Sequence, residues 1–169
     1  MKRLIPILLI GFLLVYVSSC EKDDICVEGD TPLLVLGFFD INDTTASKNV
    51  PALRVKEIEL DTIMNSFADR TNLDSIGIPL RSGATSTGFV LYHNSRSEAE
   101  TGVELGNGDT LTISYTVREA FISRACGFVA HYDELEVNLS GGAENWIRDI
   151  SVVQQTIENS NNIHVKIFY

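Results

Sequence analysis

The sequence predicts an all-β protein, in the first instance an antiparallel β-sandwich, with a small β-barrel as the alternative. Three observations lead to this fold class. Short runs of β-branched and aromatic residues recur along the chain and are separated by Gly, Asn, Asp and Ser. Residues 110–118 alternate between apolar and polar side chains, which is typical of a strand with one buried face. No long helical pattern interrupts these runs, so we expect about seven to nine short strands.

The first 19 residues are predicted to be an export signal that precedes the fold. Lys2 and Arg3 give a positive start, and residues 4–17 form an apolar run. A helix over that run would span about 21 Å, which is short of the roughly 30 Å hydrocarbon core of a membrane. Charges from Glu21 onward prevent its extension, so a cleaved signal is favoured over a transmembrane helix.

The end of this signal resembles the lipobox of bacterial lipoproteins. Val17-Ser18-Ser19-Cys20 supplies the aliphatic residue, the two small residues and the cysteine of that motif. The resemblance implies cleavage before Cys20, a diacylglycerol on its thiol and an acylated amine. Two or three acyl chains would anchor the protein firmly, whereas one chain binds a membrane only marginally. A plain secretory signal with a free cysteine is the alternative.

The next residues carry a second resemblance. Cys20-Glu21-Lys22-Asp23-Asp24 is similar to the Cys-x-Lys-acid-acid export signal of surface lipoproteins of Bacteroidota. It implies attachment to the outer membrane through the N-terminal lipid. Beyond that, it implies that the protein is exposed at the cell surface. The alternative is that these charges only keep a lipidated tether, residues 20–30, solvated.

The remainder, residues 31–169, has the size of one β domain. Loss of the signal leaves 11 basic and 23 acidic residues, a formal net charge of −12. Such acidity argues against nucleic acid and anionic lipid as partners.

Two further cysteines, Cys26 and Cys126, form an even pair in an exported chain and predict a disulfide. Closing a loop of that length would contribute about 4.7 kcal/mol in the chain-entropy model. Two buried free thiols are the alternative.

The runs of β-branched and aromatic residues predict where each strand lies along the chain. Pro79 confines one of them to an edge or an end of a sheet, and the phase of Val55 and Ile58 suggests a bulge. Residues 63–67 form one helical turn or an irregular crossing, and Gly106-Asn107-Gly108-Asp109 is a strong turn signal. The expected strands cover residues 33–39, 53–60, 76–80, 89–93, 110–118, 146–153 and 163–169. Residues 127–132 and 135–139 add one strand or two, and residues 103–105 are a candidate for a further short one.

Several segments together resemble a family of small Bacteroidota lipoproteins of unknown function. They are Cys26 with Pro32-x-Leu34 and Phe39-Asp40, then Ile78-Pro79-Leu80, and finally Ser123-Arg124-Ala125-Cys126-Gly127-Phe128. The resemblance implies an extracytoplasmic β domain and brings no known activity.

The sequence predicts no catalytic residue, no metal site and no cofactor. It lacks a Gly-x-Ser-x-Gly elbow, and His93, His131 and His164 are far apart. The carboxylates of Glu134 and Glu136 share one face of a strand, but alternating acids usually mark a solvated face.

We therefore expect a non-enzymatic, lipid-anchored interaction or assembly module whose partner is another envelope protein. The alternative is a carbohydrate- or small-ligand-binding lipoprotein, for which an exposed Trp146 would be the first candidate contact.

Overall fold

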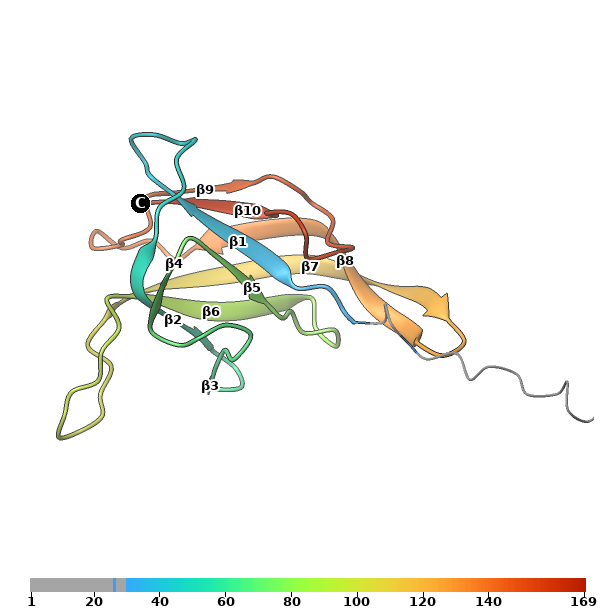
Figure 1. The fold of residues 1–169 in the computed structure, drawn as a ribbon, viewed down its shortest axis with the longest axis horizontal. Helices are drawn as coiled ribbons and strands as arrows, with labels where there is room; N and C mark the ends of the chain where they lie inside the picture. The colour runs from blue at the N-terminus through green and yellow to red at the C-terminus, as the bar shows by residue number, and fades with distance from the viewer. Residues whose placement is uncertain (1–25, 27–29) are drawn as a thin grey trace, which may run out of the picture.

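A computed structural model describes Cys26 and residues 30–169. The predicted lipid site Cys20 and the predicted export signal, Glu21 to Asp24, lie outside these residues. Within the described part, ten strands form two sheets (Figure 1). The strands are β1 (Leu34–Phe39), β2 (Val50–Glu57), β3 (Thr62–Ile63), β4 (Thr71–Leu73), β5 (Ser75–Ile78), β6 (Ser86–His93), β7 (Asn107–Ser123), β8 (Gly127–Leu139), β9 (Asp149–Val152) and β10 (Val165–Phe168).

The smaller sheet has the strand order β5-β1-β10-β9. β5 and β9 pair antiparallel with their neighbours, but β1 and β10 run parallel. The expected antiparallel arrangement therefore fails for one pair, in which the first and the last strand lie side by side. β5 is an edge strand and stops directly before Pro79, as a residue without a backbone N–H requires.

The larger sheet has the order β3-β2-β6-β7-β8, with β4 paired to β2, and all of its pairs are antiparallel. β4 was not predicted, because three residues carry too little pattern to be recognised as a strand.

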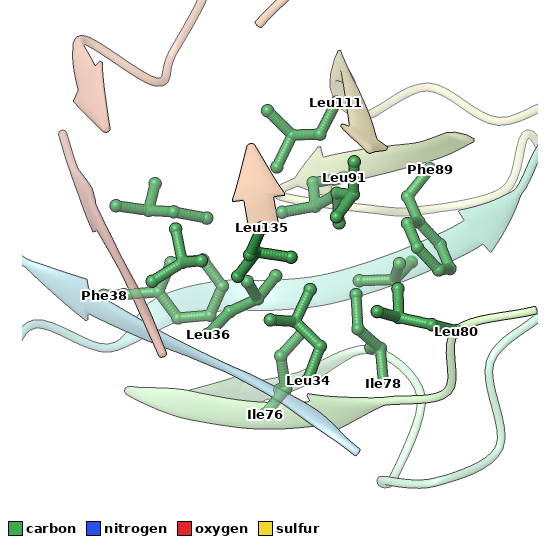
Figure 2. Packing of buried hydrophobic residues seen from close by; sticks show 14 of the residues in the cluster. Leu34, Leu36, Phe38, Ile76, Ile78, Leu80, Phe89, Leu91, Leu111 and Leu135 are labelled. Atoms are coloured by element: carbon green, nitrogen blue, oxygen red, sulfur yellow. The ribbon is translucent and has the colours of Figure 1, made fainter. Parts of the chain in front are cut away.

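The core lies between the two sheets, which do not close into a barrel over the described residues. Alternate apolar side chains point inward from each sheet, as the period of two requires. Figure 2 shows them meeting in one cluster that includes Leu34, Leu36, Phe38, Ile76, Ile78, Leu80, Phe89, Leu91, Leu111 and Leu135. The predicted β-sandwich is therefore confirmed.

The turn expected at residues 106–109 is wrong, because Asn107, Gly108 and Asp109 begin β7. Gly108 pairs with Tyr92, and a Cβ at this position would lie 2.6 Å from Cε1 of that ring. The Asp109 carboxylate is buried and accepts a hydrogen bond from the backbone N–H of Ile147 at 2.8 Å. Cross-strand packing thus overrides the local turn signal.

One smaller expectation is corrected, and one open alternative is decided. β2 ends at Glu57, so Ile58 is exposed outside the strand, and the irregular register lies earlier, between Val50 and Leu53. Residues 64–67 form an irregular crossing after β3 and no helical turn.

β7 and β8 extend well beyond the rest of their sheet. The register between β6 and β7 ends at Ser114, whereas β7 and β8 stay paired as far as Ser123 and Gly127. Residues 119–130 therefore form a two-stranded arm, which projects from the sandwich in Figure 1. No helix among the described residues is long and apolar enough to span a membrane.

Candidate functional site

The first candidate site is the loop that joins β6 to β7, residues 94–106. The residues that flank it, His93 and Asn107, are paired in the sheet. A hairpin at that point could close with two residues, yet this connection has thirteen. Connections of that length in compact domains are uncommon and often functional.

Glu104 fastens this loop from inside. One carboxylate oxygen accepts hydrogen bonds from the backbone N–H groups of Arg96 at 3.0 Å and Gly106 at 2.9 Å. The other accepts the Ser95 hydroxyl at 2.9 Å and pairs with the guanidinium of Arg70 at 3.2 Å. A single side chain therefore closes both ends of the connection, and we call residues 94–106 the stapled loop.

Two arginines tie the stapled loop to β2 and to the start of β4. Arg54 pairs with Glu104 at 3.3 Å and also forms an ion pair with Asp69. Arg70 donates to the hydroxyls of Ser95 at 3.0 Å and Ser97 at 2.6 Å. The Arg54 and Glu104 side chains are largely shielded from water, with exposed fractions of 16% and 18%, so the ion pair between them is screened less than a surface pair.

The electrostatics agree with this arrangement. Burial raises the pKa of Glu104, but the hydrogen bonds from Gly106, Ser95, Arg70 and Arg96 outweigh it and hold the pKa below its usual value. The carboxylate is therefore ionised at neutral pH.

The backbone beside the loop is strained. Among the described residues, five non-glycine residues have a positive φ, and three of them, Ala52, Arg70 and Asn94, lie where the loop meets β2 and β4. Besides the side chain of Arg70, the backbones of the other two attach the loop: the Ala52 carbonyl accepts a hydrogen bond from the Ser95 N–H at 3.1 Å, and the Asn94 N–H donates to the Pro51 carbonyl at 2.9 Å. Such conformations cost about 1–3 kcal/mol each and concentrate at functional sites.

The stapled loop presents apolar side chains on an acidic background. Val103 is 55% exposed and Leu105 is 44% exposed. Glu98 and Glu100 lie on the same loop, and the Glu98 N–H donates to the Val103 carbonyl at 2.8 Å. A fixed loop that shows apolar groups to solvent is suited to protein recognition.

The second candidate site is the end of the arm. Phe121 and Phe128 face each other across β7 and β8, with ring centroids 5.3 Å apart, and they are 59% and 66% exposed. Ile122 is also exposed. We call these three residues the apolar tip.

The disulfide joins Cys26 to Cys126 at this end of the molecule, with the two Cα atoms 4.9 Å apart. The predicted pair is thus confirmed. It links the N-terminal segment to the arm, two residues from Phe128.

The three histidines do not converge. His164 is buried and its Nδ1 accepts the N–H of Val35 at 3.0 Å. His93 stacks near Trp146, and His131 lies 3.9 Å from Glu158. In the part of the chain that the structure covers, no three His, Cys, Asp or Glu side chains are grouped as metal ligands.

Trp146 is not the exposed platform that carbohydrate binding would use. It is only 8% exposed, and its Nε1 donates to the carbonyl of Leu91 at 3.0 Å. Its ring packs edge-on against Tyr169 and near Phe38, so it belongs to the core.

Glu134 and Glu136 line a shallow polar groove of about 630 Å³ together with Thr85, Ser114 and Thr116. Glu134 accepts a hydrogen bond from the Thr116 hydroxyl at 2.8 Å. Tyr115 also borders the groove, but its hydroxyl points inward to Thr87 and to the Arg81 carbonyl. The groove therefore offers polar contacts without an exposed aromatic face.

Comparison with protein families gives one match. A family model described as a family of unknown function, DUF6452, matches residues 52–169. The match covers more than half of the chain, so the chain belongs to this family. No curated protein and no solved structure matches it.

Proposed function

We propose that this member of the DUF6452 family is a lipid-anchored, non-enzymatic interaction module of the bacterial outer membrane, and that it binds another envelope protein through the stapled loop. The single observation that carries the proposal is the internal fastening of that loop by Glu104. A connection needed only to join β6 and β7 would not require a shielded carboxylate with two arginine partners.

The energetics support a binding role for the loop. Ordering a residue costs about 1–2 kcal/mol of backbone entropy, and a loop ordered before binding avoids that cost when a partner docks. Exposed Val103 and Leu105 supply apolar contacts, and the acidic side chains around them favour a partner with a basic rim.

The position of the loop is consistent with the proposed anchor. In Figure 1 the yellow-green loop and the arm lie toward opposite ends of the longest axis. The arm is joined to Cys26, six residues after the proposed lipid site Cys20. Anchoring at that end leaves the stapled loop directed away from the bilayer.

The test is recovery of a partner from native membranes. The tagged full chain is cross-linked, extracted in mild detergent and compared with a Val103→Ser/Leu105→Ser variant. We expect a reproducible outer-membrane protein with the native chain and at least about tenfold less of it with the variant, as loss of a central apolar contact implies.

Val153→Ser is the matched control, because Val153 is 52% exposed but lies outside the loop, directly after β9. The control should retain the partner. Equal recovery with the native chain and the loop variant, or no reproducible partner with either, would contradict the proposal.

A further inference from the structure

We propose that the apolar tip of the arm inserts into the interface of a phospholipid bilayer, as a second membrane contact beside the lipid anchor. This inference rests on the proposed anchoring through Cys20. It assigns a membrane-facing surface to the folded domain itself.

The exposed apolar side chains of the tip are the first observation that supports insertion into a bilayer. Phe121 and Phe128 already contact each other across the hairpin, yet more than half of each side chain remains in water. Ile122, the next residue of β7, is also exposed. Clustered exposed apolar groups mark an interaction surface, and Phe side chains partition into the headgroup and acyl boundary.

The charge around the tip indicates which surface it meets. No acidic residue occurs between Glu119 and Asp133, although the whole chain has a net charge of −10. Arg124, at the turn, can pair with lipid phosphate. The tip is thus the part of an acidic protein that approaches a headgroup layer with apolar groups and one positive charge.

The segment between Cys20 and Cys26 limits the distance between the proposed acyl chains and the tip of the arm. Cys26 follows Cys20 by six residue steps, which span at most about 21 Å when the chain is fully extended. The disulfide places Cys26 beside Cys126, so the tip cannot lie much farther than this from the proposed acyl chains. Without the disulfide, the tether would be longer and the tip would not be held near the bilayer.

The base of the arm is braced. Arg118 pairs with Asp133 at 2.7 Å and with Glu158 at 2.7 Å, where β7 and β8 leave the sandwich. These contacts link both strands of the arm to the segment that precedes β10. The base of the arm is therefore joined to the sandwich through Glu158 as well as through its own sheet.

The test measures the depth of a tryptophan at the tip. The full-length lipidated chain, purified from membranes, is reconstituted into vesicles of phosphatidylethanolamine and phosphatidylglycerol. Phe128→Trp and Phe121→Trp are compared with Leu60→Trp, a control at a residue of the β2–β3 turn that is 62% exposed. The one native tryptophan, Trp146, is buried and is the common reference.

We expect blue-shifted emission from both tip variants, and quenching by shallow brominated lipids at least about twofold stronger than for Leu60→Trp, as interfacial insertion implies. If the chains bind vesicles but the tip tryptophans are quenched no more than the tryptophan of Leu60→Trp, this inference is overturned and the anchor is left intact. Shielding of the tip only after addition of envelope proteins would also overturn it, in favour of a protein contact. A chain that does not float with vesicles would overturn both the anchor and this inference.

Discussion

Gly106 closes the stapled loop because no side chain fits at its position. A Cβ there would lie 2.9 Å from the Cα of Ser95 and 3.1 Å from the carbonyl oxygen of His93. Both are backbone atoms and cannot rotate away. Gly106→Ala should therefore lower the free energy of unfolding by about 1–3 kcal/mol, as overpacking does, which urea denaturation would measure.

Gly141→Ala is the control for this substitution, because a Cβ at Gly141 meets nothing within 4 Å. It should change stability by less than about 0.5 kcal/mol, or stabilise slightly by restricting the unfolded chain. Equal effects of the two substitutions would contradict the close packing of the loop against Ser95.

His164 makes stability depend on pH. Burial lowers its pKa below the usual 6.5, against the opposing effect of a hydrogen bond to the Asn159 carbonyl. Its neutral Nδ1 accepts the Val35 N–H, so protonation would break that bond. Below pH 6.5 the unfolded chain binds more protons at this residue than the folded chain does, so the folded state loses stability as pH falls from 7 through the lowered pKa.

The free energy of unfolding should therefore decrease on acidification by about 1.4 kcal/mol for each unit by which the pKa of His164 lies below 6.5. His93, whose pKa is lowered by burial and by Lys48, contributes in the same direction. The measurement is urea unfolding at several pH values between 7 and 5 for the native chain and His164→Gln. If the free energy of unfolding of His164→Gln depends on pH as steeply as that of the native chain, His164 is excluded as a source of the pH dependence.

At the scale of the elements, the disulfide that joins the N-terminal segment to the arm contributes to the stability of the domain. Cys26 and Cys126 are 100 residues apart in sequence, so their bond closes most of the domain into one loop. The double variant Cys26→Ser/Cys126→Ser should lose up to about 4.7 kcal/mol of stability in the chain-entropy model. Thermal or urea unfolding checks this, and a loss under about 1 kcal/mol would show that the bond constrains the unfolded chain little.

The sequence predicts the strands well where one face is buried. Residues 110–118 were recognised because alternation continues through Leu111, Ile113 and Tyr115, all of which are buried. The same criterion fails in the arm, where β7 continues through exposed residues that pair with β8 alone among the strands of the described chain. The parallel pairing of β1 and β10 also leaves no local signal, because register between distant strands is decided by tertiary packing.

The candidate sites were less predictable than the fold. The staple brings Glu104 together with Arg54 and Arg70, which lie 50 and 34 residues away in the sequence. No spacing rule pairs charges over such distances. The disulfide could be predicted because the chain offers only one even pair after Cys20. Phe121 and Phe128 could have drawn attention as aromatic residues that flank an acid-free turn.

At the scale of the whole molecule, the two candidate sites lie toward opposite ends of one sandwich (Figure 1). The arm end is joined to the N-terminal segment through Cys26, and the stapled loop lies toward the other end. A core shared by both sheets connects them rigidly. The proposed division is thus a membrane-proximal arm and a distal binding loop, and it depends on an acylated Cys20.

Intact-mass spectrometry of the chain purified from native membranes tests that dependence most directly. We predict a chain that begins at Cys20, carries a diacylglycerol and an N-acyl group, and weighs two hydrogens less than its reduced form because of the Cys26–Cys126 bond. A chain that retains residues 1–19, or that begins at Cys20 without acyl groups, would contradict the account.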